Sequence, residues 1–413
     1  MHLNHGLHLT YCTNVHRGET WAETSAALEN STLAVRDRVC PGRPFGIGLR
    51  LSARAARELG DPTTLLTFRR WLDRHQCYVF TVNGFSFGAF HGERVKERVF
   101  LPDWTTPERL DYTNLLLDLL SRLVPAGIEG SVSTAPGSFK GTVTTAEELK
   151  LIRDNVWRCV EHAARVSEQT GRKLHLGLEP EPLGVLENSR EVLIFFDRLR
   201  VEHRNDARLA EHLGVTYDTC HFAVAFEEPH SALASLRQHG IRISKLHLSN
   251  ALKVRATPET LAALGAFADD VYLHQVAFRT ASGKLKIYPD LPQALAHEAH
   301  LFDDGAEAGA EATAPGVLPF GPHSPPGAEW RIHFHIPLHA PATPLFNHTA
   351  DHLLGTLDAL AAAPKLCSHL EMETYTWDVL PPELKGRSVV EQLVAEYGWT
   401  LARLAERGLA ARG

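Results

Sequence analysis

Residues 214–227, GVTYDTCHFAVAFE, combine an apolar strand with polar side chains at the point where that strand ends. Val215 and Tyr217 belong to a run typical of a buried strand, and Asp218 and His221 follow at its end. A carboxylate at the tip of a buried strand is costly to remove from water unless something pairs with it. The sequence therefore implies that Asp218 has a partner, which the other strand ends help to identify.

Short apolar segments of this kind alternate with longer amphipathic segments along most of the chain. The strand candidates are 7–14, 45–52, 77–84, 130–136, 174–181, 215–221, 244–250, 331–339 and 368–377. The clearest helix is 144–171, with Thr144 or Thr145 as its cap, acidic residues in its first turn and Gly171 after it. Strands and helices in alternation are typical of α/β folds with parallel strands.

About eight such units indicate a (β/α)8 barrel, a fold that takes about 250 residues before insertions. One strand candidate is then surplus, and we expect it to be 45–52 or a neighbouring strand. An open, doubly wound sheet is the main alternative, but no G-x-G-x-x-G motif follows any candidate strand. Residues 303–329, rich in alanine, glycine and proline, are predicted to be a flexible insertion in a single domain that spans 1–413.

The composition is that of a globular protein, with 44% hydrophobic and 22% charged residues. The formal net charge of −7 disfavours a nucleic-acid-binding protein, which normally carries a basic stripe. The six cysteines form no C-x-x-C motif and are expected to be buried thiols. The first residues lack the pattern of a signal peptide, and no apolar run reaches the ~18 residues of a membrane span, so we expect a cytoplasmic protein.

Several strand ends carry side chains of the kinds that bind metal ions. In a barrel the carboxyl ends of the strands meet at one face, where the chemistry takes place. The predicted metal ligands, in chain order, are Glu179, Asp218, His247, His335 and Glu373. Three carboxylates packed together would repel one another without a cation, so we infer that Asp218 pairs with a divalent metal ion. Mixed carboxylate and imidazole ligands suit Mn²⁺, Zn²⁺, Fe²⁺, Co²⁺ or, less well, Mg²⁺.

The spacing leaves two of these ligands open. Glu181 lies two residues beyond Glu179 on the same loop, and Glu371 shares a strand face with Glu373. Proline after Glu179 stops strand pairing there, and Glu373 lies nearer the end of its strand than Glu371. We therefore prefer Glu179 and Glu373 as ligands, with Glu181 as a substrate contact.

This ordered set of residues resembles the ligand set of the xylose-isomerase-like barrel superfamily, which includes sugar isomerases, sugar epimerases and endonuclease IV. The superfamily carries four ligands on successive late strands, and the residues that match them in order are Glu179, Asp218, His247 and Glu373. The Asp-x-x-His pair Asp218/His221 also fits. In the epimerases an arginine closely follows the histidine ligand, whereas HLSNALKVR (247–255) has Asn250 nearby, so the resemblance does not specify the substrate.

A closer resemblance is to the EboE-type metabolite traffic proteins of this superfamily, and it spans nearly the whole chain. It rests on LTYCTNVHRGETW (9–21), TVNGFSFGAFHGERVKERVFLPDW (81–104) and HLEMETYTWDVLP (369–381). The group takes its name from an operon linked to export of a precursor metabolite, which does not specify a reaction. The resemblance implies a small-molecule metabolite as the partner of this protein.

Further polar residues at or near strand ends are candidates for contacts with the substrate. The predicted substrate contacts are Asn14, His16, Asn83, His91, Lys140, Glu181 and Asn250. His221, which follows Asp218 by three residues, is a further candidate catalytic residue that can contact the substrate or the metal. By analogy with endonuclease IV, His91 can alternatively hold a second metal ion.

Three functions fit this pattern. The first is an isomerase or epimerase of a hydroxy-carbonyl compound, in which Glu179 and Glu373 shuttle a proton beside a Lewis-acidic metal. The second is a metal-dependent phosphoester hydrolase, by analogy with endonuclease IV, which requires two or three metal ions. The third is a non-catalytic carrier that keeps the fold and the site. We favour the first function.

Overall fold

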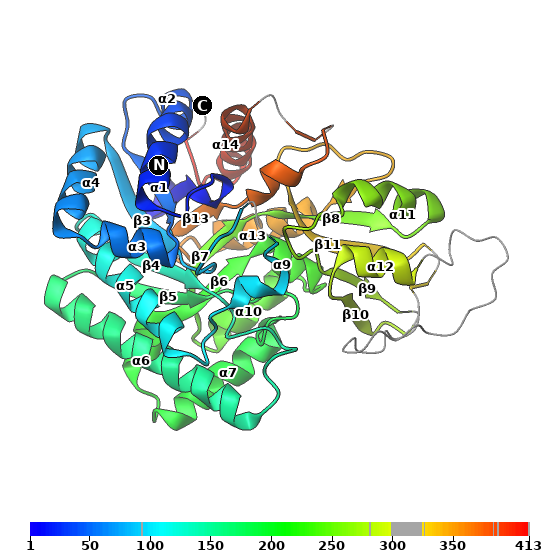
Figure 1. Cartoon of the computed structure of the whole chain (residues 1–413), viewed down its shortest axis with the longest axis horizontal. Helices are drawn as coiled ribbons and strands as arrows, with labels where there is room; N and C mark the ends of the chain where they lie inside the picture. Colours follow the sequence, from blue (N-terminus) through cyan, green and yellow to red (C-terminus); the bar gives the residue numbers. More distant parts are fainter. Residues whose placement is uncertain are drawn as a thin grey trace.

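The computed structural model describes residues 1–91, 94–280, 282–298, 324–325, 327–382, 384–385 and 388–411. Eight parallel strands form a nearly closed barrel, which confirms the predicted fold (Figure 1). Their spatial order is β1-β13-β7-β6-β5-β4-β3-β2, and a bridge between Cys12 and Gly48 connects β1 to β2. The barrel strands are β1 (His8–Tyr11), β2 (Phe45–Arg50), β3 (Cys77–Asn83), β4 (Gly130–Thr134), β5 (Leu174–Leu178), β6 (Leu213–Asp218), β7 (Arg242–Leu248) and β13 (His369–Met372).

Helices cover the outside of the barrel and bury the outer faces of its strands, as expected for parallel strands. They are α1 (Trp21–Ala27), α2 (Leu33–Val39), α3 (Ala53–Leu59), α4 (Pro62–Arg74), α5 (Pro107–Leu123), α6 (Ala146–Thr170), α7 (Ser189–Glu202), α8 (Ala207–His212), α9 (Thr219–Val224), α10 (Pro229–Gln238), α13 (Ala350–Ala362) and α14 (Val389–Glu406). The helix predicted over 144–171 is α6. Thr145 caps it in a capping box with Glu148, and Gly171 ends it with φ of 66°.

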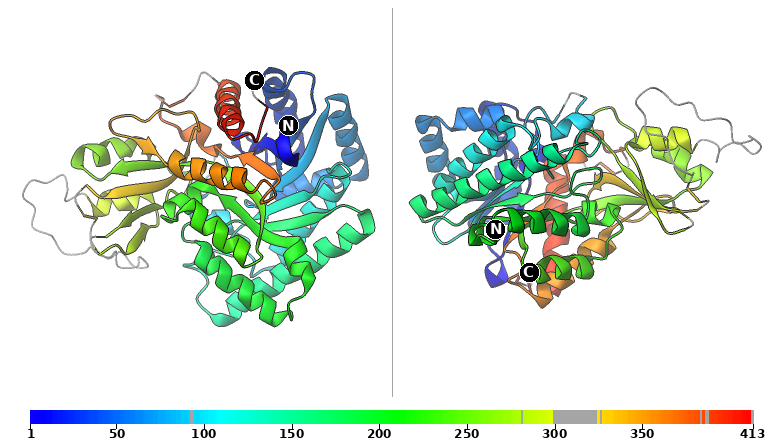
Figure 2. Two further views of the ribbon diagram at one scale, coloured as in Figure 1. Left: turned by 180° about the vertical axis from the view of Figure 1, so that it is seen from behind. Right: turned by 90° about the horizontal axis from the view of Figure 1, so that it is seen from below.

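A second, antiparallel sheet is inserted in the sequence between β7 and α13. Its strands lie in the order β10-β9-β11-β8-β12, and Figure 2 shows this unit to one side of the barrel. The elements are β8 (Asn250–Arg255), α11 (Pro258–Leu264), β9 (Val276–Arg279), β10 (Leu285–Tyr288), α12 (Leu291–His297), β11 (Glu329–Ile336) and β12 (Asn347–His348). Its core of Leu252, Phe278, Trp330 and Phe334 is separate from the barrel core.

The expectation that 45–52 or a neighbour is the surplus strand is wrong. Segment 45–52 forms β2 of the barrel, whereas 331–339 forms β11 of the second sheet. An apolar pattern reports burial and not the identity of the partner strand, so it could not separate the two sheets. The insertion predicted over 303–329 precedes β11 and lies mostly outside the described residues.

None of the helices in the described part of the chain combines the length and the apolar composition needed to cross a membrane.

Gly48 on β2 lies where the barrel interior leaves no room for a side chain. A Cβ atom at this position would sit 2.8 Å from the Tyr11 carbonyl oxygen and closer still to the Glu371 carboxylate. Both neighbours are buried, so neither can move away without disturbing the barrel. Glycine at position 48 therefore makes space for the Glu371 carboxylate inside the barrel.

We predict that Gly48→Ala lowers the free energy of unfolding by about 1–3 kcal/mol or more, because the added methyl group overpacks the barrel interior. Urea unfolding followed by circular dichroism measures the change. Gly398→Ala is the matched control: a Cβ atom there meets open space within α14, so about 0.5–1 kcal/mol of stabilisation is expected. Equal effects of the two substitutions would contradict this account of Gly48.

Candidate functional site

Four predicted ligands come together at the carboxyl ends of the barrel strands. Glu179 follows β5, Asp218 ends β6, His247 lies on β7 and Glu373 follows β13. Each offers one ligand atom, and these atoms all lie within 4.8 Å of one another. All four side chains are buried, with exposed fractions between 0% and 5%. We refer to these four residues as the acidic centre.

His247 lies in the middle of the acidic centre. Its Nδ1 atom lies 2.8 Å from Glu179 Oε1, 3.1 Å from Glu373 Oε2 and 3.5 Å from Asp218 Oδ2. Burial disfavours the charged imidazolium, but the negative charges of Glu179 and Glu373 outweigh it and raise the pKa of His247 well above its usual value. The imidazole nitrogen and the three carboxylates thus face a common point.

Glu371 lies beneath this centre. Its Oε2 atom contacts His247 Nε2 at 2.8 Å and Lys245 Nζ at 2.5 Å, and Lys245 Nζ also donates to Ser133 Oγ at 3.1 Å. Burial opposes ionisation of Glu371, but Lys245 and His247 outweigh it and lower its pKa to about 2. Glu371 therefore orients His247 so that Nδ1 points at the other carboxylates, as a hydrogen-bond partner behind a metal ligand does.

Asp218 is held by donors on one oxygen only. Oδ1 accepts hydrogen bonds from the backbone N–H groups of Cys220 at 2.7 Å and His221 at 3.1 Å, and from Ser249 Oγ at 2.6 Å. Oδ2 has no hydrogen-bond partner among the described residues, and neither has Oε2 of Glu179. Buried carboxylate oxygens without donors are costly, and a divalent cation accepts such a donor set of oxygens and imidazole. The residues therefore fit a metal ion.

Two predicted substrate contacts hold Glu373 in place. Asn14 Nδ2 and Asn83 Nδ2 donate to Glu373 Oε1 at 2.8 Å and 3.0 Å. His91 lies behind them, with Nε2 2.6 Å from the Asn14 carbonyl oxygen and Nδ1 2.6 Å from the Tyr272 hydroxyl. The two amide groups fix one oxygen of Glu373.

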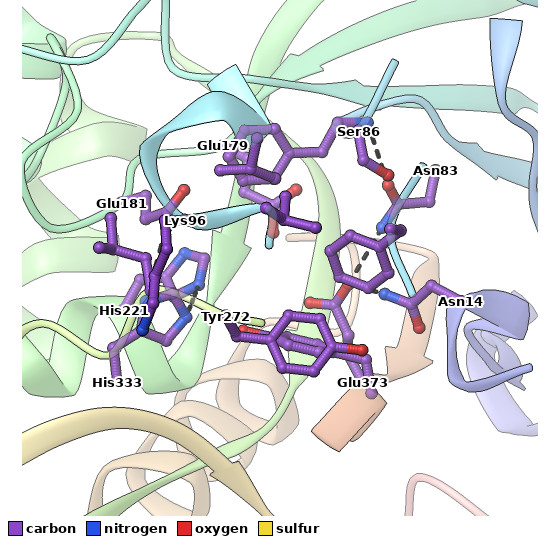
Figure 3. Close-up of a pocket in the computed structure, with 16 residues that line it drawn as sticks. Asn14, Asn83, Ser86, Lys96, Glu179, Glu181, His221, Tyr272, His333 and Glu373 are labelled. Carbon is purple, nitrogen blue, oxygen red and sulfur yellow. Dashed lines mark hydrogen bonds and ion pairs between the residues drawn. The ribbon is translucent and has the colours of Figure 1, made fainter. Parts of the chain in front are cut away.

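A pocket opens onto the acidic centre, and Figure 3 shows the side chains around it. Polar residues that line it are Asn14, Asn83, Ser86, Lys96, Glu179, Glu181, His221, Tyr272, His333 and Glu373. Burial raises the pKa of Glu181 to about 8. About 530 Å³ of space lies within this lining when its opening to solvent is included.

His335 is close to the centre but belongs to a different group. It lies on β11 of the second sheet, and it offers a ligand atom within 4.8 Å of atoms of Asp218 and His221. A further group joins His335 with Cys220 and His333. The i, i+2 spacing of His333 and His335 placed them on one face, and the structure places that face against the barrel mouth.

Four predicted substrate contacts do not line the pocket described above, namely His16, His91, Lys140 and Asn250. His16 Nε2 lies 2.9 Å from the Tyr11 hydroxyl. The Lys140 ammonium group binds Glu191 at 2.7 Å and also Glu187. Asn250 is buried on β8, in the second sheet.

Sequence reasoning missed Lys96 and Tyr272, which line the pocket. Lys96 pairs with Asp290 at 2.7 Å, and Tyr272 contacts His91. Lys96 lies after the end of β3, and Tyr272 lies between η5 (Gly265–Phe267) and β9. Neither lies directly at a strand end, because Lys96 begins the short helix η4 (Lys96–Phe100), so the sequence carries no local signal for them.

No protein-family model and no curated protein matches the chain. Similar solved structures include the probable 3-DHS dehydratase AsbF involved in petrobactin synthesis from Bacillus anthracis, with 11% identity, a TM-score of 0.47, and 95% of this chain and 98% of that chain covered. The IolI protein with a binding zinc atom has 12% identity, a TM-score of 0.47 and coverages of 97% and 99%. L-ribulose 3-epimerase has 11% identity, a TM-score of 0.49 and coverages of 97% and 95%. The EboE-type assignment stays a prediction.

We predict that Lys245→Met lowers the free energy of unfolding by about 3–5 kcal/mol, because it leaves the Glu371 carboxylate buried beside His247 without its lysine. The double variant Lys245→Met/Glu371→Gln should recover part of that loss. Chemical denaturation of the three proteins measures both effects. Lys150→Met, which breaks the exposed pair with Asp154, serves as control and should cost less than about 1 kcal/mol. A double variant no more stable than Lys245→Met would contradict the assigned pairing.

Proposed function

We propose that the protein is a divalent-metal-dependent isomerase or epimerase of a small hydroxy-carbonyl compound, with sugar-like substrates as the first class to test. The metal ligands in this proposal are Glu179, Asp218, His247 and Glu373. The observation that carries the proposal is the pair Glu179 and Glu373, which contact the same imidazole nitrogen and line the same pocket. Strands β6 and β7 separate β5 and β13, the strands that Glu179 and Glu373 follow.

A divalent ion in this centre supplies a Lewis acid that polarises a carbonyl group and acidifies the neighbouring C–H bond. The side chains of the protein then move the proton. Glu179 has one oxygen free of hydrogen-bond donors and can accept a proton at Oε2. Glu373 lines the same pocket, with Oε1 held by Asn14 and Asn83. Two carboxylates on opposite sides of one carbon can remove and return a proton on different faces.

The pocket also supports the choice of a small substrate. Its walls combine aromatic side chains such as Phe90 and Tyr375 with the amides and carboxylates of the centre. Tyr272 and Lys96 add a hydroxyl and an ammonium group to this lining. Such a mixture suits a compact polar compound with several oxygens. The resemblance to metabolite traffic proteins adds the proposal that this compound is a metabolite destined for export, handled in the cytoplasm.

We predict that Glu179→Gln and Glu373→Gln each slow proton exchange at the substrate carbon by about 10²–10⁴-fold, because each removes a general acid–base group. The measurement is incorporation of solvent deuterium into hydroxy-carbonyl sugars and their phosphates in D₂O, followed by NMR. The exposed Glu168→Gln on α6 is the control and should exchange at the wild-type rate.

The metal content of the same samples, measured by elemental analysis, tests the acidic centre independently of the exchange assay. His247→Ala should lose the metal of the acidic centre, because it removes the only nitrogen ligand. A wild-type protein that takes up no Mn²⁺ or Zn²⁺ would contradict the metal site. A protein that retains metal and binds ligands without any deuterium exchange would contradict catalysis and favour a carrier.

A further inference from the structure

We propose that the end of the barrel opposite the acidic centre binds a small organic anion with at least two negative charges, in a hollow lined by Arg237, Arg242 and Lys365. We refer to this hollow as the basic hollow. The inference goes beyond the proposed function, because the acidic centre and its pocket use none of these residues.

The basic hollow lies where several barrel strands begin. Its lining includes Glu129 just before β4, His175 near the start of β5, residues 240–244 around the start of β7 and residues 363–368 before β13. Arg242 opens β7, and His247 of the acidic centre lies near the other end of the same strand. A strand that rises ~3.3 Å per residue separates the two by roughly 16 Å. A ligand in the basic hollow is therefore distinct from a ligand in the pocket at the acidic centre.

The lining runs from exposed cations to buried side chains. Arg237 and Lys365 are exposed, whereas His175, Ile241 and Ser244 are buried. About 1310 Å³ of space lies within the lining when its opening to solvent is included. A molecule bound here can therefore leave water on one side and still contact the cations.

Positive charge prevails in this lining. Arg242 Nη1 binds Glu129 Oε2 at 2.7 Å, and Lys173 Nζ lies 4.0 Å from Glu129 Oε1, so two cations already compensate this carboxylate. In the part of the chain that the structure describes, neither Arg237 nor Lys365 has a carboxylate partner. The three cations and one carboxylate of the lining leave two positive charges, in a chain whose formal net charge is −7. An anion with two negative charges would balance them.

His175 adds a buried polar group that the protein does not satisfy. Burial and the charge of Arg242 hold the pKa of His175 well below its usual value, so the ring is neutral. Its Nδ1 atom has no hydrogen-bond partner among the described residues, and its Nε2 atom lies 3.6 Å from Glu129 Oε2, beyond hydrogen-bond distance. A neutral imidazole carries one N–H donor. An oxygen of a bound ligand can accept a hydrogen bond from this ring.

The composition of the lining identifies the chemical class of the ligand. Guanidinium groups bind carboxylates and phosphates through paired, charge-assisted hydrogen bonds, and an ammonium group adds a further donor. Apolar side chains of Ile241, Ile243 and Leu366 line the same hollow. Ligand sites that combine apolar walls with a few charged groups suit organic molecules rather than bare ions. Phosphate esters and polycarboxylates share the required chemistry.

Isothermal titration calorimetry of the full-length protein tests the inference, with glycerol 3-phosphate and citrate as probes at constant ionic strength. We expect the wild type to bind at least one of them. Arg237→Gln/Lys365→Gln should weaken that binding about tenfold or more, because it removes two charged donors. The matched control is Arg69→Gln/Arg70→Gln, which removes the same charge from exposed positions on α4 and should bind like the wild type.

Two further variants sharpen the assignment. Glu129→Gln removes the one carboxylate of the lining and releases Arg242, so it should raise the affinity for the same probe about twofold to tenfold. His247→Ala removes a ligand of the acidic centre, where an anion can also bind through a metal ion. Binding in the basic hollow should persist in that variant.

Several outcomes would overturn the basic hollow. They are a wild type that binds neither probe, a double variant Arg237→Gln/Lys365→Gln with wild-type affinity, an equal loss in the control pair, or a loss of binding in His247→Ala. Binding of glycerol 3-phosphate alone would assign the hollow to phosphate esters, and binding of citrate alone would assign it to polycarboxylates. Circular dichroism checks folding of each variant. None of these outcomes changes the metal content of the wild type or its deuterium exchange, so the proposed function is tested independently.

Discussion

Negative charge buried at the barrel mouth is the constraint on which the rest of the structure depends. Glu179, Asp218 and Glu373 face one nitrogen of His247, and Glu371 faces the other. These carboxylates can be buried together only where cations and hydrogen-bond donors compensate their negative charge. Lys245 inside the barrel, Asn14 after β1, Asn83 at the end of β3 and the backbone N–H groups that follow Asp218 all supply that compensation. Glycine on β2 leaves the volume that one of these carboxylates occupies.

The second sheet is part of the site rather than an independent appendage. Its strand β11 brings His333 and His335 to the barrel mouth, and the loop before β9 supplies Tyr272 and Gln275. Each of these side chains contacts a residue that the barrel contributes: His333 contacts His221, and Tyr272 contacts His91. The inserted sheet thus adds imidazoles to a site otherwise rich in carboxylates.

The two groups of ligands differ in chemistry although they share Asp218. Carboxylate oxygens dominate the acidic centre, whereas imidazole nitrogens dominate the neighbouring group of Asp218, His221 and His335. Proton transfer next to a carbonyl group needs one Lewis acid, whereas phosphoester hydrolysis commonly uses a pair of cations. The number of metal ions therefore separates the function classes that the barrel alone leaves open, because fold does not specify reaction.

The sequence by itself determined the barrel strands, the long helix α6 and the order of the polar strand ends, because burial patterns, caps and prolines act over a few residues. It did not predict strands β8, β9, β10 and β12 of the second sheet. It predicted that Glu179, Asp218, His247 and Glu373 would meet. The i, i+2 spacing of Glu371 and Glu373 places them on one strand face. Only the tertiary structure decided which partner each of these two carboxylates contacts. Strand register does this, since the pairing of β13 with β7 sets Glu371 level with His247.

The tertiary structure likewise determined to which sheet β11 belongs. Its apolar pattern is the same for a barrel strand and for a strand of the inserted sheet, so the sequence could not assign it. His335 was predicted to complete a single ring of ligands, but the structure groups it with His221 and Asp218. The physical reason is that strand pairing depends on contacts between distant segments, whereas the sequence pattern records only the local alternation of buried and exposed side chains.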